Sequence, residues 1–510
     1  MAKPTFTWEQ IRTHNTQKDA WTVIDGEVYD LTSFAKRHPG GDLIYYAAGQ
    51  DGSTHFHCYH VGTNAHKVLS KLHIGTLATS EPRIKMGEFH NELERRVDAL
   101  FKTPGFSKFP VSSQLDWGLS MLLNAMCWSL IVFGGSSLRL LGHTTESAPG
   151  WLTLACHALD ALVACVHFTT NSRIIGYRHA AGHGSLFKNW RYNHLATLAC
   201  FALGGHDNGY TYFYGADNKV ASDSMMHTFQ NSAEQHPASQ HKFGHFFGQH
   251  VGVHHVQTNI VAVDFDSVPF SRAFVKDGNA CLTKAHGPPC AVNTGLWLEW
   301  ITASIFSGPV SCFALPIPMG LSVILEPFTY FTGGWGTSQG PLDRALLFAA
   351  GLCCAAQGFL YGTSMLYWGG PWRFVQAWVA IALYSHLMNH PMGLKVMHYI
   401  EEFQYENQAD FHSDWGAIQV RRTINNEPVW WNMMDCPGTC CYHLEHHLFP
   451  GCNPHVLPVI QPVVRQCCKD FGLEYRQYTR KQVWDAYREF AKEPRSFPIK
   501  QESIKGGKAQ

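Results

Sequence analysis

The chain has 510 residues and a mass of 57.2 kDa; 45% of its residues are hydrophobic and only 15% are charged. Its 39 lysines and arginines balance 39 aspartates and glutamates, so no basic excess neutralises nucleic-acid phosphates and we expect no nucleic-acid partner. Low charge combined with 32 phenylalanines, 19 tyrosines and 16 tryptophans excludes a largely disordered chain. The 31 histidines indicate metal binding, because imidazole is the commonest metal-ligating side chain.

The pattern of residues 1–80 predicts a small α+β module whose short helices and strands are separated by frequent turns. The segment 21–30 is expected to form two strands that turn at Asp25-Gly26. A helical segment follows, and the corner His38-Pro39-Gly40-Gly41 ends it. The polar stretch 81–115 carries charged residues at helical spacing and predicts a linker with an amphipathic helix.

Apolar runs then predict an α-helical membrane domain over residues 116–480, before a polar tail at 481–510. The runs at 117–141 and 151–170 are each long enough to cross a bilayer, and the short loop between them predicts a helical hairpin. Three further apolar runs follow. We expect the runs at 298–332 and 344–367 to cross the membrane, which gives about four transmembrane helices in all, and the run at 372–388 to be an interfacial or re-entrant helix.

The charges flanking the hairpin predict its orientation. Two lysines precede it and two arginines follow it, whereas the turn holds a single arginine: Lys102 and Lys108, Arg173 and Arg178, and Arg139. The excess of positive charge at the outer ends places both ends in the cytosol. The first residues do not show the basic segment followed by an apolar segment that marks a secretion signal, so we expect no cleavable signal. We therefore expect the cysteines to be reduced.

The N-terminal module is too small to be stable on a bare core, so a cofactor is expected at its centre. A haem with two axial imidazoles needs one histidine from each side of a cleft. His38 stands at the Pro-Gly-Gly corner, where the glycines allow close approach of the porphyrin edge. About two short helices later we choose His60 as the second ligand, with His55 and His57 as alternatives.

Residues 6–77 resemble a cytochrome b5 domain. The resemblance rests on Phe6-Thr-Trp8, Val28-Tyr-Asp30, the His38 corner and Gly49-Gln-Asp51. It implies a haem b held by His38 and His60. Their spacing is shorter than in free-standing members and resembles the variant fused to lipid desaturases.

Three histidine clusters lie near the expected cytosolic ends of the membrane helices. Their members are His179 and His183; His250, His254 and His255; and His443, His446 and His447. An i,i+4 pair places both imidazoles on one face of a helix, ready to approach one metal. Eight imidazoles suit two metals, and although nitrogen-rich sites admit iron, zinc or copper, redox partnership with a haem favours iron.

These clusters, from about residue 150 to 475, resemble the histidine boxes of the membrane fatty-acid desaturases, and the fused haem module resembles their front-end branch. Further matches are Gln249–Asn259 with Asp264-Phe-Asp266, Asp414–Val420 and Glu445–Pro450. Three features depart from the pattern: Ala180 replaces a usual Asp, His443 replaces the usual Gln, and the stretch between the first two boxes is long. The resemblance also implies a ligand after the later apolar helix, which we assign to His390, leaving His386 open; His241 and His245 are expected to be solvated or to lie behind the ligands.

The resemblance implies oxygen-dependent, front-end desaturation of a polyunsaturated acyl lipid or acyl-CoA in the endoplasmic reticulum membrane, with haem and boxes facing the cytosol. The expected cofactors are haem b and two non-haem irons; the expected electron donor is NADH-cytochrome b5 reductase. The three-residue gap between His250 and His254 favours delta-5 or delta-4 over delta-6 chemistry. The alternatives are a sphingolipid desaturase or lipid hydroxylase, and a membrane-anchored haem carrier with degenerate boxes.

Overall fold

The structure is a computed structural model. It describes residues 3–61, 64–81, 83–203, 254–255, 258, 271–276, 279–284, 317, 341–389, 414–427, 441–479, 481–483, 485–486 and 495–498. The expected crossing at 298–332 lies outside these residues except for one position, as do His241, His245, His250 and His390.

The N-terminal module is built on a five-stranded sheet in the order β1-β5-β4-β3-β2. Its strands are β1 (Thr5–Phe6), β2 (Asn15–Thr16), β3 (Asp19–Ile24), β4 (Glu27–Asp30) and β5 (His73–Leu77). Strands β1 and β5 are parallel and the other pairs are antiparallel. Asp25 (φ 54°) and Gly26 (φ 84°) both adopt the left-handed conformation that a two-residue hairpin turn requires. The predicted hairpin is therefore confirmed.

Short helices surround this sheet: α1 (Trp8–Arg12), the 3₁₀ helices η1 (Ala35–Arg37) and η2 (Gly41–Ala47), α2 (Ser53–His60) and α3 (Ala65–Leu69). The helical segment expected before His38 is thus a single 3₁₀ turn. Three small apolar clusters lie in the described part of the module. Their centres are Ile11 and Val23, Ala20 and Tyr45, and Ile24 and Phe56. None is large, which agrees with a module that depends on a cofactor.

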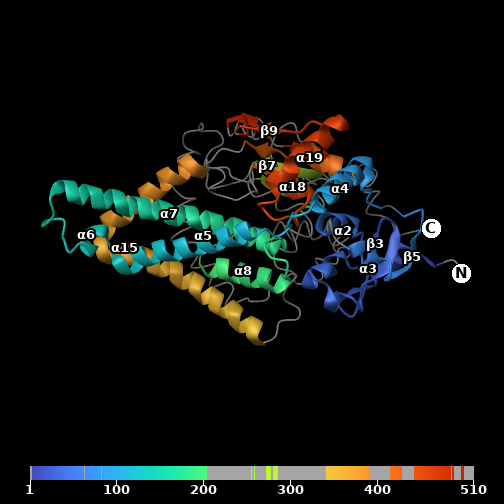
Figure 1. Cartoon of the computed structure of the whole chain (residues 1–510), viewed down its shortest axis with the longest axis horizontal. Coiled ribbons are helices and arrows are strands. Elements are labelled where there is room, and N and C mark those ends of the chain that lie inside the picture. Colours follow the sequence, from blue (N-terminus) through green and yellow to red (C-terminus); the bar gives the residue numbers. More distant parts are fainter. Residues whose placement is uncertain are drawn as a thin grey trace.

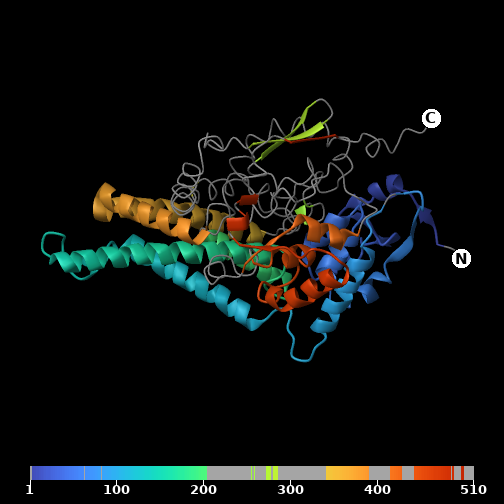
Figure 2. The same ribbon diagram turned by 90° about the horizontal axis from the view of Figure 1, so that it is seen from above.

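The expected amphipathic helix is α4 (Gly87–Phe101), which buries Phe89, Leu93 and Val97. These residues enter an extensive hydrophobic core shared with α16 (Trp415–Arg422), α18 (His443–Leu448) and α19 (Leu457–Asp470). Cys58 of α2 and the following Val61 belong to the same core. The N-terminal module is therefore packed against the C-terminal region, and the two lie side by side in Figures 1 and 2.

Apolar helices extend away from that core in both views. They are α5 (Val111–Ser129), continued by the π-helical turn η3 (Leu130–Gly134), then α6 (Ser137–Leu140), α7 (Gly150–Gly182), α8 (Trp190–Ala202) and α15 (Pro341–Asn389). Among the described residues, three stretches are long and apolar enough to cross a membrane: Val111–Gly134, Gly150–Gly182 and Ala345–Trp368. The α5–α7 hairpin has the predicted form, and α7 runs beyond its expected end to carry the first histidine box.

The segment 372–388 is helical, as expected, and it is not among the stretches long and apolar enough to cross a membrane. This segment continues α15, which changes direction along its length (Figure 1). Its apolar stretches, Ala345–Trp368 and Phe374–Leu383, flank the sequence Gly369-Gly-Pro371, and proline in a helix produces such bends. Ala377 and Ile381 pack against Ala164 and Phe168 of α7, so the segment is part of the helix bundle. Its interfacial or re-entrant placement in the membrane stays a prediction.

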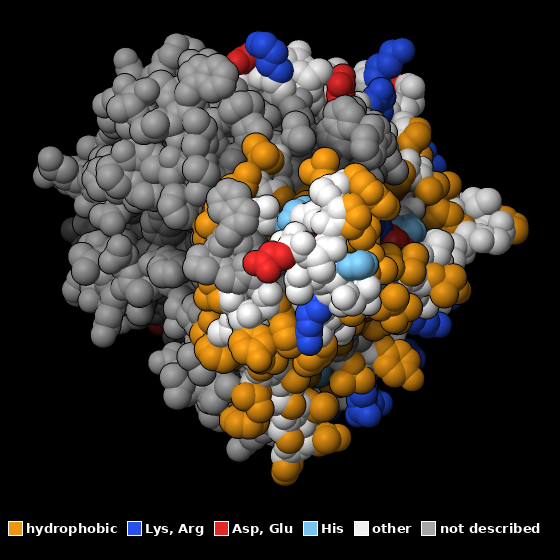
Figure 3. Space-filling view, turned by 90° about the vertical axis from the view of Figure 1, so that its left-hand side faces the viewer, with side chains coloured by type: hydrophobic (Ala, Val, Ile, Leu, Met, Phe, Trp, Pro, Cys, Tyr) orange, Lys and Arg blue, Asp and Glu red, His pale blue; other side chains and the backbone are white. Residues whose placement is uncertain are grey.

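The bundle carries its hydrophobic side chains outward. Figure 3 views the end remote from the N-terminal module, where hydrophobic side chains predominate over the described surface. Exposed members include Leu122 and Phe133, Trp151 and Leu162, and Phe348 and Phe359. Such a surface is unfavourable in water and suits the interior of a bilayer.

Smaller strands complete the described part. Strands β6 (Ser271–Lys276), β7 (Asn279–Lys284) and β10 (Arg495–Pro498) form one antiparallel sheet, and β8 (Asn425–Asn426) pairs in parallel with β9 (Gln477–Tyr478). Part of the expected polar tail thus pairs with a segment that follows the second histidine box.

Candidate haem and metal centres

The predicted haem ligands face each other in the N-terminal module. His38 is the C-cap of η1 and His60 is the last residue of α2, and their ring centroids lie 5.9 Å apart. With metal–nitrogen distances of about 2 Å, two imidazoles on one metal have centroids about 6 Å apart. A Cβ on Gly40 would lie 2.8 Å from Cε1 of His38, so a larger residue at that position would displace the His38 ring.

Main-chain carbonyls orient both rings. Nδ1 of His38 donates to the carbonyl of Gly41 at 3.1 Å, and Nδ1 of His60 donates to the carbonyl of Phe56 at 2.8 Å. These bonds place the proton on Nδ1 and the lone pair on Nε2, the atom that a haem iron needs. Burial lowers the pKa of His38, and burial, with the repulsion that a protonated His38 would exert, lowers the pKa of His60 to about 3; both shifts favour the neutral imidazole. The pair fits a haem.

The alternative ligand His57 points elsewhere. Its Nε2 lies 2.9 Å from Oδ2 of Asp25 and its Nδ1 lies 2.9 Å from Oε2 of Glu94. Both ring nitrogens are thus engaged by carboxylates away from His38, which favours His60 over His57.

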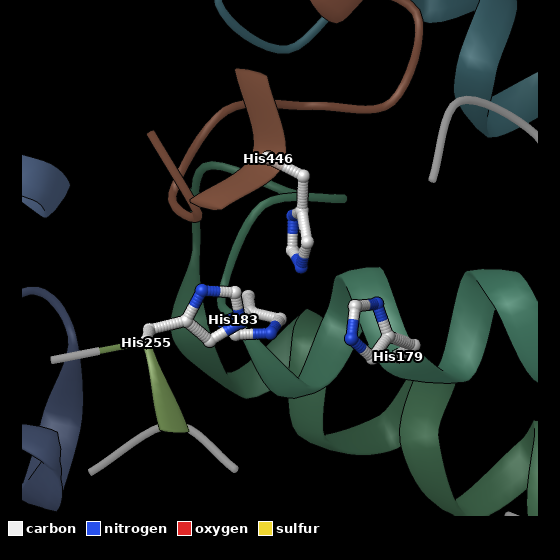
Figure 4. A group of neighbouring side chains, drawn as sticks. All are labelled: His179, His183, His255 and His446. Carbon is white, nitrogen blue, oxygen red and sulfur yellow. The ribbon is translucent and has the colours of Figure 1, made fainter. Parts of the chain in front are cut away.

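Four predicted metal ligands converge from three distant segments. His179 and His183 come from the end of α7, His446 from α18, and His255 from the second box. One ring nitrogen of each lies within 4.8 Å of the others, and the rings face a common centre (Figure 4). His183, His255 and His446 are at most 4% exposed, so the cluster is shielded from water.

A second group of histidines adjoins the first. His447 has ring centroids 4.8 Å from His254, 4.5 Å from His255 and 4.6 Å from His443. All four rings are buried. The structure therefore brings together seven of the eight box histidines; His250 lies outside the described residues, as does the predicted additional ligand His390.

The donor set fits a pair of metals. Imidazole nitrogens within 4.8 Å of each other are close enough to converge on one ion after small movements. The first group provides one such position, and the rings of the second group lie directly beside it. Nitrogen ligands suit iron, so this buried set of imidazoles suits redox-active metals in a water-poor environment.

Residues of α16 hold the second box in place, a role that the sequence did not reveal. The Thr258 hydroxyl lies 3.1 Å from Oε1 of Gln419 and 3.3 Å from Nδ1 of His447. Nε2 of Gln419 donates to the carbonyl of His255 at 3.4 Å. Arg422 donates to the carbonyl of Thr258 at 3.0 Å. Partners of this kind orient ligating imidazoles and raise metal affinity.

A carboxylate on α18 fixes the third box from behind. Glu445 is fully buried and accepts from the Tyr475 hydroxyl and from Nδ2 of Asn425, both at 2.7 Å. Burial outweighs these bonds and raises the pKa of Glu445 to about 7. Asn425 also accepts from the backbone of Leu444 at 2.7 Å, so this one residue holds the histidine-bearing helix at two neighbouring positions.

The two centres are joined by one side chain. Tyr59 precedes the haem-ligand candidate His60, and its hydroxyl lies 2.8 Å from Nδ1 of His183. A Cβ on Gly451 would lie 2.9 Å from the Tyr59 ring, so the chain after α18 packs closely on this tyrosine. Sequence analysis missed Tyr59, because nothing in its neighbourhood indicates a partner 124 residues away.

Of the three departures from the desaturase pattern, the two single-residue replacements are buried. Ala180 is 3% exposed on α7, so no carboxylate is present at this position beside the first box. His443 is 4% exposed and contacts His447, so the replacement of the usual glutamine adds an imidazole next to the second group.

Comparison with known proteins finds two families along this chain. A model of the cytochrome b5-like heme/steroid binding domain matches residues 7–78, and a fatty acid desaturase model matches residues 236–479. The acyl-lipid (8-3)-desaturase of Physcomitrium patens is 27% identical, covering 95% of this chain and 89% of its own. That of Mortierella alpina is 24% identical, covering 95% of each chain. Fatty acid desaturase 3 of Homo sapiens is 26% identical, covering 92% of this chain and 89% of its own.

Proposed function

We propose that this chain, a membrane fatty acid desaturase with an N-terminal cytochrome b5-like domain, inserts a front-end double bond into a polyunsaturated acyl chain. The family makes it an oxidoreductase that uses haem and a di-iron centre, transfers electrons and acts on a fatty acyl substrate. The proposal concerns which residues hold these groups, where the double bond forms and which protein donates the electrons.

The single observation that carries the proposal is the contact between Tyr59 and His183. It links the helix of the haem pair to the histidine cluster through one side chain and one hydrogen bond. Cys58 and Val61 are buried in the core that they share with α18. The ammonium group of Lys108 donates a hydrogen bond to the Val61 carbonyl. The haem domain is therefore docked beside the cluster, as an internal electron donor should be.

In this account the haem is held by His38 and His60. The di-iron ligands are the box histidines with His390: His179, His183, His250, His254, His255, His443, His446 and His447. Haem supplies single electrons, and a di-iron centre uses oxygen to remove two hydrogens from adjacent methylenes. The chain's own residues orient the ligands, exclude water and position the acyl chain.

The substrate assignment rests on two features. The gap between His250 and His254 favours delta-5 or delta-4 chemistry. Two similar proteins are named acyl-lipid (8-3)-desaturases, which supports an acyl-lipid rather than an acyl-CoA substrate. We propose domain limits of 1–80 for the haem domain, 81–115 for the linker and 116–480 for the desaturase domain, with a tail at 481–510.

We also propose an electron donor and a location. We assign NADH-cytochrome b5 reductase as donor and the endoplasmic reticulum as the membrane. Helix α2, which ends at His60, and helix α18, which carries His446, lie at the same end of the α5–α7 hairpin (Figure 1). The flanking lysines and arginines favour the cytosolic side for that end.

Expression in a host that lacks polyunsaturated lipids tests the proposal. With a panel of polyunsaturated acids supplied, we expect a new cis double bond on the carboxyl side of an existing one, located by mass spectrometry. The His446→Ala variant is the matched control and should give no product. A hydroxylated product or a desaturated sphingoid base would contradict the proposal, and unchanged lipids with haem as the only iron would indicate a haem carrier.

A further inference from the structure

A second cluster of metal-ligating side chains lies between the haem domain and α4. It comprises His57 of α2, His90 and Glu94 of α4, and Asp25 at the β3–β4 turn. Glu94 Oε2 lies 2.9 Å from His57 Nδ1 and 3.9 Å from His90 Nε2. The ligand atoms of His57, His90 and Glu94 all lie within 4.8 Å of one another.

His90 makes this cluster unusual. Its side chain is fully buried, and neither ring nitrogen has a hydrogen-bond partner among the described residues. Leaving a buried polar group unsatisfied costs about 1–3 kcal/mol. A Cβ on Gly416 would lie 3.2 Å from its Nδ1, so the backbone of α16 packs against that edge while Nε2 is directed toward Glu94.

A protonated His57 explains only part of the cluster. Burial opposes its ionisation, but its hydrogen bonds to Asp25 and Glu94 raise its pKa to about 9. An imidazolium between two carboxylates would satisfy those three groups. It would leave His90 buried without a partner and would add a positive charge beside it, so this explanation does not account for His90.

We propose that His57, His90 and Glu94 bind a zinc ion, with Asp25 orienting His57. Two imidazoles and one carboxylate form a zinc donor set that leaves a fourth position for water. Ligand atoms around tetrahedral zinc lie about 3.3 Å apart, between the two distances observed. His90 and Glu94 are an i,i+4 pair on one helical face, which suits joint ligation.

The role of Asp25 follows from the same geometry. Nδ1 of His57 faces Glu94, so zinc takes that nitrogen, and Nε2–H donates to Oδ2 of Asp25 at 2.9 Å. A carboxylate behind a ligating histidine fixes the ring and strengthens its binding. The two carboxylates also match the charge of a divalent cation when both imidazoles are neutral.

The site would join two parts of the chain. His57 and Asp25 belong to the haem domain, and α4 packs against α16 and α19 of the desaturase domain. A zinc ion here would therefore hold the haem domain in its docked position, two residues from Tyr59. The site shares no residue with the histidine boxes, so the inference does not depend on the proposed function.

Metal analysis of the full-length detergent-solubilised protein tests the proposal. Wild type, His90→Gln, Glu94→Gln and His446→Ala are loaded with zinc chloride, desalted and analysed for zinc and iron per haem. His66→Gln is the matched control, because His66 is an exposed histidine whose ring lies 6.1 Å from that of His57. We expect one zinc that His446→Ala and His66→Gln retain and that both α4 variants lose, with the haem absorbance unchanged.

Three results would overturn the proposal. Equal zinc in wild type and both α4 variants would exclude the site. Zinc lost only from His446→Ala would assign it to the histidine boxes. Absence of zinc from the loaded wild type would leave a protonated His57 bridging two carboxylates. If His90→Gln loses its haem absorbance through misfolding, the more conservative Glu94→Gln decides.

Discussion

The haem pair and the histidine cluster both offer imidazoles as metal ligands, but their ligands are distributed differently along the chain. His38 and His60 are 22 residues apart and belong to one small module. The histidines of the cluster extend from His179 on α7 to His447 on α18. One site is local, whereas the other exists only when the whole chain is folded.

The difference extends to how the rings are oriented. In the haem pair each Nδ1 donates to a nearby main-chain carbonyl, which no side-chain substitution removes. In the cluster the partners are side chains from distant segments: Tyr59 for His183 and Thr258 for His447. We therefore expect the haem site to survive damage to the cluster, and the cluster to be sensitive to substitutions far from it.

The largest expected effect is that of His446→Ala. His446 lies beside His179, His183 and His255, and its loss removes a ligand at the centre of the first group. We expect desaturation to fall by at least about 100-fold and non-haem iron to be lost, while the haem absorbance remains. Product analysis together with iron and haem content measures this. Full activity would remove the third box from the mechanism.

The converse variant is His60→Ala, which leaves the cluster intact. We expect the haem absorbance to disappear and reductase-dependent desaturation to fall nearly as far, while non-haem iron stays at the wild-type level. Spectra and iron analysis of the same preparation decide. His57→Ala is the comparison, since both nitrogens of His57 face carboxylates rather than His38; loss of haem in that variant alone would reverse our choice of ligand.

A smaller effect is expected for Tyr59→Phe, which keeps the ring and removes the hydroxyl that contacts His183. Both metal sites should remain occupied, but re-oxidation of the reduced haem should slow about 10-fold, because the direct hydrogen-bonded connection is lost. Stopped-flow spectroscopy measures this rate. Tyr45→Phe is the control, since Tyr45 is a buried tyrosine of the same module whose hydroxyl donates to the Gln17 carbonyl at 3.5 Å. Equal rates in both variants would exclude Tyr59 from the connection.

The smallest expected effect is that of Thr258→Val. The substitution preserves shape but removes the hydroxyl between Gln419 and His447. We expect iron affinity to fall severalfold to about 10-fold with haem unaffected, as is usual when a partner of a ligating histidine is lost. Iron retention during graded chelation measures it. Retention equal to wild type would show that Gln419 and α16 do not orient the ligand.

Much of the fold could be predicted from the sequence because its signals are local. The turn at Asp25-Gly26, the amphipathic helix α4 and the α5–α7 hairpin each depend on residues within one segment. The histidine boxes were identified from spacing and resemblance, and the structure brings the described members together. Their assignment as ligands stays a prediction.

What escaped prediction depends on contacts between distant segments. The sequence indicated a tethered haem domain, but only the fold shows Cys58 and Val61 entering the core of α18 and α19. Tyr59 carries no motif of its own, and the direction of the segment after Gly369-Gly-Pro371 depends on packing against α7. Such contacts leave little periodic pattern in a single sequence.

The most direct test of the account is the rate at which reduced haem is re-oxidised after mixing with oxygen and substrate. If the docked haem domain supplies its own cluster, wild type should show a fast first-order phase that is independent of protein concentration and absent from His446→Ala. A rate that rises in proportion to protein concentration, or that His446→Ala leaves unchanged, would contradict electron transfer within one chain.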